Sequence, residues 1–220
     1  MPNDIWALLG KGIFESLYMV IVSTLCAYIF GIPIGVILNI TDENGICPNR
    51  AVNTILGVIV NILRSIPFII LLIAILPFTR ALIGTTIGST ATIVPLVVSA
   101  APFVARMVES SLKEVDSGVI EAAESMGSSR FQIIWKVLLP EARPSLIVGS
   151  AIAITTILGY SAMAGFTGGG GLGTIAINYG YYRYNNQVMF ITVILLVIIV
   201  QIFQEIGMRI ANRSDKRINK

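Results

Sequence analysis

The chain has 220 residues, of which 55% are hydrophobic and only 12% are charged, and its net charge is +3 at pH 7. A soluble domain carries about 25% charged residues, so this composition excludes an ordinary soluble domain and indicates an integral membrane protein. The small net charge gives no reason to expect a nucleic-acid partner. The sequence contains no histidine and only two cysteines. It therefore excludes catalytic Ser-His-Asp and Cys-His sets and offers no pattern for a metal site or a disulfide framework.

Five segments are long and apolar enough to cross a bilayer as helices, which takes about 20 residues each. They are predicted at residues 12–40, 51–76, 86–108, 146–164 and 188–207. The connections are short except for residues 109–143, which are too polar and too interrupted to span. We therefore expect one all-α membrane domain over residues 1–220, with a long loop between the third and fourth spans.

Lysine and arginine are distributed unevenly between the two sides of these spans. One side carries Lys11, Arg80 and Arg183. The other side carries Arg50, Arg106, Lys113, Arg130, Lys136, Arg143, Arg209, Arg213, Lys216, Arg217 and Lys220. Cytoplasmic loops hold the excess of basic residues. We therefore expect the N-terminus outside, with the long loop and the C-terminus in the cytoplasm.

Arg64 is the most informative charge inside a predicted span. Counted from Ala51 it lies about 20 Å along the helix, near the middle of roughly 30 Å of hydrocarbon. Inserting an arginine at that depth costs about 2.5 kcal/mol or more unless its side chain faces a cavity or a partner. Pro67, three residues later, should loosen the helix. Arg64 either lines a pathway or makes a structural ion pair or hydrogen bond, and the residues leave both interpretations open.

The long loop is predicted to hold two short helices joined by a sharp turn. Residues Val119, Ala122, Ala123 and Met126 have the i, i+3, i+4, i+7 spacing of an amphipathic helix. Gly127 should end this helix in the left-handed conformation. Ser129 and Gln132 fit a capping box that starts the second helix, which we expect to carry Phe131, Ile134 and Leu138 on one side and to stop at Pro140. Such a pair lies against a surface and does not span.

The same loop resembles the EAA loop of permease subunits of ABC importers. That pattern is Glu-Ala-Ala, three residues, Gly, nine residues, Ile, one residue and Leu-Pro. Here it reads Glu121-Ala122-Ala123, Gly127, Val137 and Leu139-Pro140, with Val137 as the one departure. The resemblance implies that Glu121, Ala122, Ala123, Gly127, Leu139 and Pro140 contact a separate ATP-hydrolysing subunit. An amphipathic pair resting on the membrane surface is the alternative.

Three stretches resemble methionine-uptake permeases in particular. They are Arg64-Ser-Ile-Pro-Phe-Ile-Ile-Leu-Leu72, Glu121 to Pro140, and Ser161 to Tyr184. The resemblance favours a translocation pathway that includes Arg64, Ser65, Pro67, Tyr160, Ser161 and Met163. A thioether among small residues suits an apolar substrate, but the sequence slightly favours the alternative that Met163 fills a gap in the packed core.

The glycines at positions 168, 170 and 173 match the spacing of a dinucleotide-binding fingerprint. The context does not, because no strand precedes them and no acidic residue follows about 20 positions later. We expect a flexible loop instead, able to move or to receive a partner. No Walker A pattern occurs in the sequence either.

These features predict a type I ABC-importer-like permease subunit with five spanning helices and a cytoplasmic coupling loop over about residues 109–143. The resemblance implies a bacterial inner (plasma) membrane location, a homodimer, two copies of an ATPase that binds ATP and Mg²⁺, and an external substrate-binding protein. This chain is expected to bind no cofactor and to catalyse no reaction. Methionine is the expected substrate, with another small amino acid as the alternative. An ion-coupled secondary transporter is a further alternative, but the predicted spans lack deep carboxylates and an internal repeat.

Overall fold

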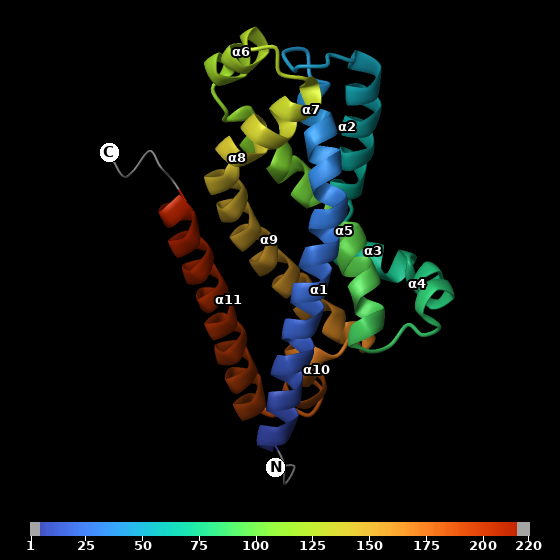
Figure 1. The fold of residues 1–220 in the computed structure, drawn as a ribbon. Coiled ribbons are helices and arrows are strands. Elements are labelled where there is room, and N and C mark those ends of the chain that lie inside the picture. Colours follow the sequence, from blue (N-terminus) through green and yellow to red (C-terminus); the bar gives the residue numbers. More distant parts are fainter. Residues whose placement is uncertain (1–4, 215–220) are drawn as a thin grey trace. The chain divides into compact units, whose positions relative to one another are not determined.

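The computed structural model describes residues 5–214, and its regular elements in that range are all helical. Lys216, Arg217 and Lys220, which count among the charges predicted to be cytoplasmic, lie outside the described residues. Figure 1 labels the α-helices along the chain. Their bounds are α1 Ile5–Ile40, α2 Arg50–Ser65, α3 Phe68–Ala74, α4 Leu76–Ile83, α5 Ser89–Lys113, α6 Ser117–Ser125, α7 Arg130–Ile133, α8 Leu139–Glu141, α9 Arg143–Met163, α10 Gly171–Ile175 and α11 Asn186–Ser214.

Among the described residues, four helical segments are long and apolar enough to cross a membrane, and they begin with α1, α5, α9 and α11. A fifth span results if α2 and α3 are counted together. These two helices do not form one continuous rod. Pro67 takes an extended conformation (φ −57°, ψ 133°), since its ring prevents it from continuing the hydrogen-bond ladder. By contrast, Pro33 lies inside an uninterrupted α1.

Two compact units share these helices, and each draws on three parts of the chain. Unit 1 comprises residues 1–27, 66–100 and 153–204, and unit 2 comprises residues 28–65, 101–152 and 205–220. The large buried side chains of unit 1 include Met19, Leu72, Leu96, Ile157 and Leu172. Those of unit 2 include Leu38, Val104, Val108, Leu112, Ile133 and Leu138. The interpretation of residues 1–220 as one domain stays a prediction.

Candidate functional site

The predicted elbow in the long loop is formed by α6, a turn at Gly127 and α7. Asp116 caps α6, because its side chain accepts a hydrogen bond from the Gly118 amide at 2.7 Å. The helix closes with Ser128 N–H donating to Ala123 O at 3.1 Å. Gly127 has φ +77°, the left-handed conformation that glycine adopts without steric cost. The prediction for Gly127 is confirmed.

Ser129 restarts the chain as α7. Its amide donates to Gln132 Oε1 at 2.8 Å, and the Gln132 amide donates to Ser129 Oγ at 3.3 Å. The predicted capping box is therefore confirmed, with both of its reciprocal bonds present. Such a cap fixes the direction in which the second helix leaves the turn.

The expectation that Pro140 stops the second helix is wrong. Residues 134–138 widen into a π-helix, and the Leu139 amide donates to Ile134 O, five residues back. Pro140 then lies in the first turn of α8, where a missing N–H matters little. The chain stays almost continuously helical up to α9, so Leu139 and Pro140 belong to a helical link and not to a helix end.

The apolar face of the elbow is mostly exposed. Of the stripe predicted on α6, only Ala123 is buried, whereas Val119 is 42% and Met126 is 79% exposed. Phe131 and Leu138 are predicted to lie on the same side of the second helix, but Phe131 is 69% exposed whereas Leu138 is buried. The two side chains therefore do not share one environment. Within unit 2, Ala123, Ile133 and Leu138 are buried, and most other apolar side chains of the elbow are exposed. Exposed large apolar side chains on a polar loop are a feature of interaction surfaces.

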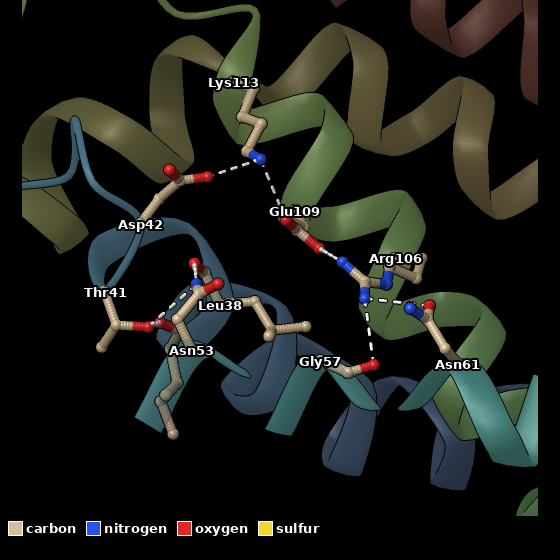
Figure 2. A network of polar contacts seen from close by, with 10 residues as sticks. Leu38, Thr41, Asp42, Asn53, Gly57, Asn61, Arg106, Glu109 and Lys113 are labelled. Atoms are coloured by element: carbon tan, nitrogen blue, oxygen red, sulfur yellow. Dashed lines mark hydrogen bonds and ion pairs between the residues drawn. The ribbon is translucent and has the colours of Figure 1, made fainter. Parts of the chain in front are cut away.

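A pocket of about 560 Å³ lies beside α6 in unit 2. Its lining includes Asn39, Asp42, Leu112, Lys113, Glu121, Glu124 and Leu138. Lys113 Nζ lies 2.7 Å from Asp42 Oδ2 (Figure 2). The hydrogen bond from Lys113, with the positive charge of its ammonium, lowers the pKa of the Asp42 carboxyl below its usual value, although partial desolvation opposes the shift. The side chains of Glu121 and Glu124 are exposed, so the site presents carboxylates beside apolar groups.

The residues proposed for a pathway divide between the two units. Arg64 and Ser65 end α2 in unit 2, where both are exposed and Ser65 Oγ donates to Asn61 O at 2.8 Å. Pro67, Tyr160, Ser161 and Met163 belong to unit 1. A pathway role for the whole set stays a prediction.

Within unit 1, the break at Pro67 places Phe68 against Tyr160. The two rings stack with centroids 4.7 Å apart and planes 5° from parallel. Ser161 is buried, and its hydroxyl donates to Leu158 O at 2.8 Å. Met163 is 41% exposed, which argues against the alternative that it fills a core.

The segment from Gly168 to Gly173 is not the free loop that we expected from the sequence. The Gly171 amide donates to Glu15 Oε2 at 2.8 Å, and the Leu172 amide donates to Ser16 Oγ at 2.9 Å. A Cβ on Gly173 would lie 2.4 Å from Ala162 O, so glycine there permits close packing against the end of α9. The glycines serve tight packing in unit 1 and not mobility.

Sequence reasoning missed three polar residues on α5. Arg106, Glu109 and Lys113 form hydrogen bonds and ion pairs in unit 2. The charge count places Arg106 and Lys113 among the loop residues and takes no account of Glu109. The predicted third span ends at residue 108, whereas α5 continues to Lys113. Their i, i+3, i+7 spacing was the available signal.

Long apolar helices with an elbowed, partly exposed helix pair between two of them are the fold of a multi-spanning membrane protein. The chain belongs to the family of binding-protein-dependent transport system inner membrane components, whose model matches residues 31–220. This is a family of ABC transporter permease subunits.

Individual relatives match almost the whole chain. A probable D-methionine transport system permease protein, MetI, of Vibrio cholerae is 49% identical over 96% of this chain and 93% of its own length. The methionine import system permease protein MetP of Bacillus subtilis is 45% identical over 98% of this chain and 97% of its own length. A solved structure of the MetNI methionine ABC transporter in inward-facing conformations is 47% identical, with a TM-score of 0.96, and covers 98% of this chain and all of that one.

Proposed function

We propose that this chain is the permease subunit of an ATP-driven importer of methionine. The relatives that match nearly its full length at 45–49% identity are named for methionine transport, which supports this substrate over another small amino acid. Proteins that share a fold often differ in substrate, so the experiments below test methionine separately from the permease role.

The exposed elbow carries the proposal. Glu121, Ala122, Ala123 and Gly127 lie on its first helix and turn, and Leu139 and Pro140 lie in the helical link that follows. The capped and sharply turned pair presents Met126 and Phe131 to the outside. A separate ATPase subunit docks on this surface, and its movement drives transport through α6 and α7.

The other components follow from this role. ATP and Mg²⁺ bind to the ATPase and not to this chain, whose sequence has no Walker A pattern. Two copies of the permease surround the central path and meet two ATPase copies on one side. An external substrate-binding protein delivers methionine on the other side. Closure of the ATPase pair then pulls the two elbows together.

The proposed orientation follows the distribution of basic residues. The N-terminus lies outside the cell, and the elbow and the C-terminus lie in the cytoplasm, where ATP is available. In this arrangement Arg64, Ser65, Pro67, Tyr160, Ser161 and Met163 contribute to the translocation pathway.

Thiol labelling combined with affinity purification tests the arrangement. In a background with Cys26→Ala and Cys47→Ala, Arg183→Cys should react from outside the cell with a membrane-impermeant maleimide, and Ser128→Cys should react only after permeabilisation. The affinity-tagged chain should also co-purify with its ATPase subunit when the two are expressed together. Labelling in the reverse pattern would place the elbow away from ATP and refute the proposal.

A further inference from the structure

A ladder of charged side chains runs along one face of α5. Arg106, Glu109 and Lys113 follow one another at i, i+3 and i+7, so they project from the same side of the helix. Arg106 Nη1 lies 2.6 Å from Glu109 Oε2, and Lys113 Nζ lies 3.0 Å from Glu109 Oε1. The Glu109 side chain is only 8% exposed. Its carboxylate thus bridges two cations, as Figure 2 shows.

The Arg106 end of the ladder reaches α2. Arg106 Nη2 donates to Gly57 O at 3.1 Å and to Asn61 Oδ1 at 2.9 Å. Gly57 and Asn61 are one helical turn apart, so one terminal nitrogen of the guanidinium holds one face of α2 while the other terminal nitrogen holds Glu109. Arginine suits this position because its planar fork holds two terminal nitrogens apart, whereas lysine has a single nitrogen.

The Lys113 end reaches the turn that follows α1. Lys113 Nζ also contacts Asp42 Oδ2 at 2.7 Å. The end of α1 and the turn after it also contact α2 directly, because Asn53 Nδ2 donates to Leu38 O at 2.7 Å and to Thr41 Oγ1 at 3.2 Å. The Asp116 cap of α6 follows Lys113 after only two intervening residues. The ladder therefore lies between α2 and the start of the elbow.

Charge burial explains why such a ladder would act as a rigid element. A carboxylate with so little exposure is tolerated only when it is paired and hydrogen-bonded. Charge-assisted bonds are short and directional, and here they join successive turns of α5 to two other segments. A displacement of α5 at Lys113 thus carries α2 with it, since sliding past α2 would break the contacts of Arg106.

We propose that Arg106, Glu109 and Lys113 are positioning residues that make α2 move with α6 when the ATPase subunit acts on the elbow. They touch neither substrate nor ATP, and the proposal rests on the proposed docking of the ATPase at the elbow. Nothing in the match to the loop pattern of residues 121–140 assigns them this role.

The test measures methionine taken up per ATP hydrolysed in proteoliposomes that contain the full complex. Arg106→Lys keeps the charge beside Glu109, but one ammonium cannot also hold both Gly57 and Asn61. Glu109→Gln keeps the shape and removes the charge that joins the two cations. The matched control is Glu205→Gln, which breaks an exposed i, i+4 pair with Arg209 (2.6 Å) elsewhere in unit 2.

Arg106→Lys and Glu109→Gln should bind the ATPase and hydrolyse ATP as the wild type does, yet lose about fivefold in uptake per ATP, a modest coupling between sites. Glu205→Gln should keep the wild-type ratio. The wild-type ratio in both ladder variants overturns the proposal, and so does a parallel loss of uptake and hydrolysis in complexes that still assemble, which indicates a purely structural role. If either ladder variant fails to assemble, Asn61→Leu removes the exposed acceptor on α2 and the same ratio decides. Absence of ATP-driven uptake by the wild type is instead a failure of the proposed function, and it removes the basis of the ladder proposal as well.

Discussion

Replacing Gly127 with valine tests whether the elbow geometry is what the ATPase recognises. The residue has φ +77°, and a Cβ added there would meet no atom within 4 Å. The substitution therefore introduces no clash with neighbouring groups. Its cost is the backbone strain of a left-handed L-residue, about 1–2 kcal/mol, and it is greatest for a β-branched side chain.

That strain can be relieved only by changing the direction of α7. The capping box at Ser129 and the exposed Phe131 would then leave their places relative to α6. We expect Gly127→Val to insert and dimerise normally and to bind the ATPase about 5–30-fold more weakly, the factor that corresponds to 1–2 kcal/mol. ATP hydrolysis should become uncoupled from uptake. Glu121→Ala should show a milder defect, because it removes one polar contact and keeps the turn.

Quantitative co-purification at graded ATPase concentrations measures this difference. Gly127→Asn is the matched control, since asparagine tolerates the left-handed conformation, and it should bind nearly as the wild type does. Wild-type association and uptake in Gly127→Val, or an equal loss in Gly127→Asn, would refute the reasoning from backbone geometry.

Three further predictions concern other parts of the chain. Asp42→Asn should destabilise the protein at neutral pH. Because Lys113 lowers the pKa of Asp42 in the folded protein, its stabilisation is present above the unfolded pKa of about 3.9 and is lost as the pH falls through the lower folded value. Thermal unfolding in detergent should therefore show the gap from wild type closing below about pH 4, and a gap independent of pH would contradict this. Phe68→Ala should lower stability by about 3–5 kcal/mol, because the ring is 4% exposed and stacked on Tyr160, whereas Tyr160→Phe should keep most of it; equal unfolding temperatures for wild type and Phe68→Ala would rule out a packed stack. Arg64→Met should alter methionine uptake while the complex with the ATPase still forms, and loss of folded protein would indicate a structural role instead.

Local rules account for what could be predicted from the sequence. The left-handed Gly127 and the capping box of Ser129 and Gln132 depend on residues within a few positions of each other, and both are present. The spanning helices follow from apolar composition over about 20 residues. The break at Pro67 has the same local origin, although the sequence predicts only a loosened helix there and the structure shows two separate helices, α2 and α3.

Features set by packing could not be predicted in this way. Pro140 does not end its helix, because the π-helix before it changes the hydrogen-bond register. The glycine-rich segment is packed, because Glu15 and Ser16, more than 150 positions earlier, accept its amide hydrogen bonds. The contacts of Arg106 and Glu109 depend on where α5 ends and on its approach to α2 within unit 2. Periodicity alone carries none of this information.

ATP-driven methionine uptake by reconstituted proteoliposomes tests the central claim most directly. The vesicles contain this chain and its ATPase, ATP is enclosed on the side of the elbow, and the binding protein and labelled methionine are added on the other. The account predicts uptake that requires ATP and the binding protein and that excess unlabelled methionine abolishes. Uptake that proceeds without ATP and follows an imposed ion gradient would contradict it.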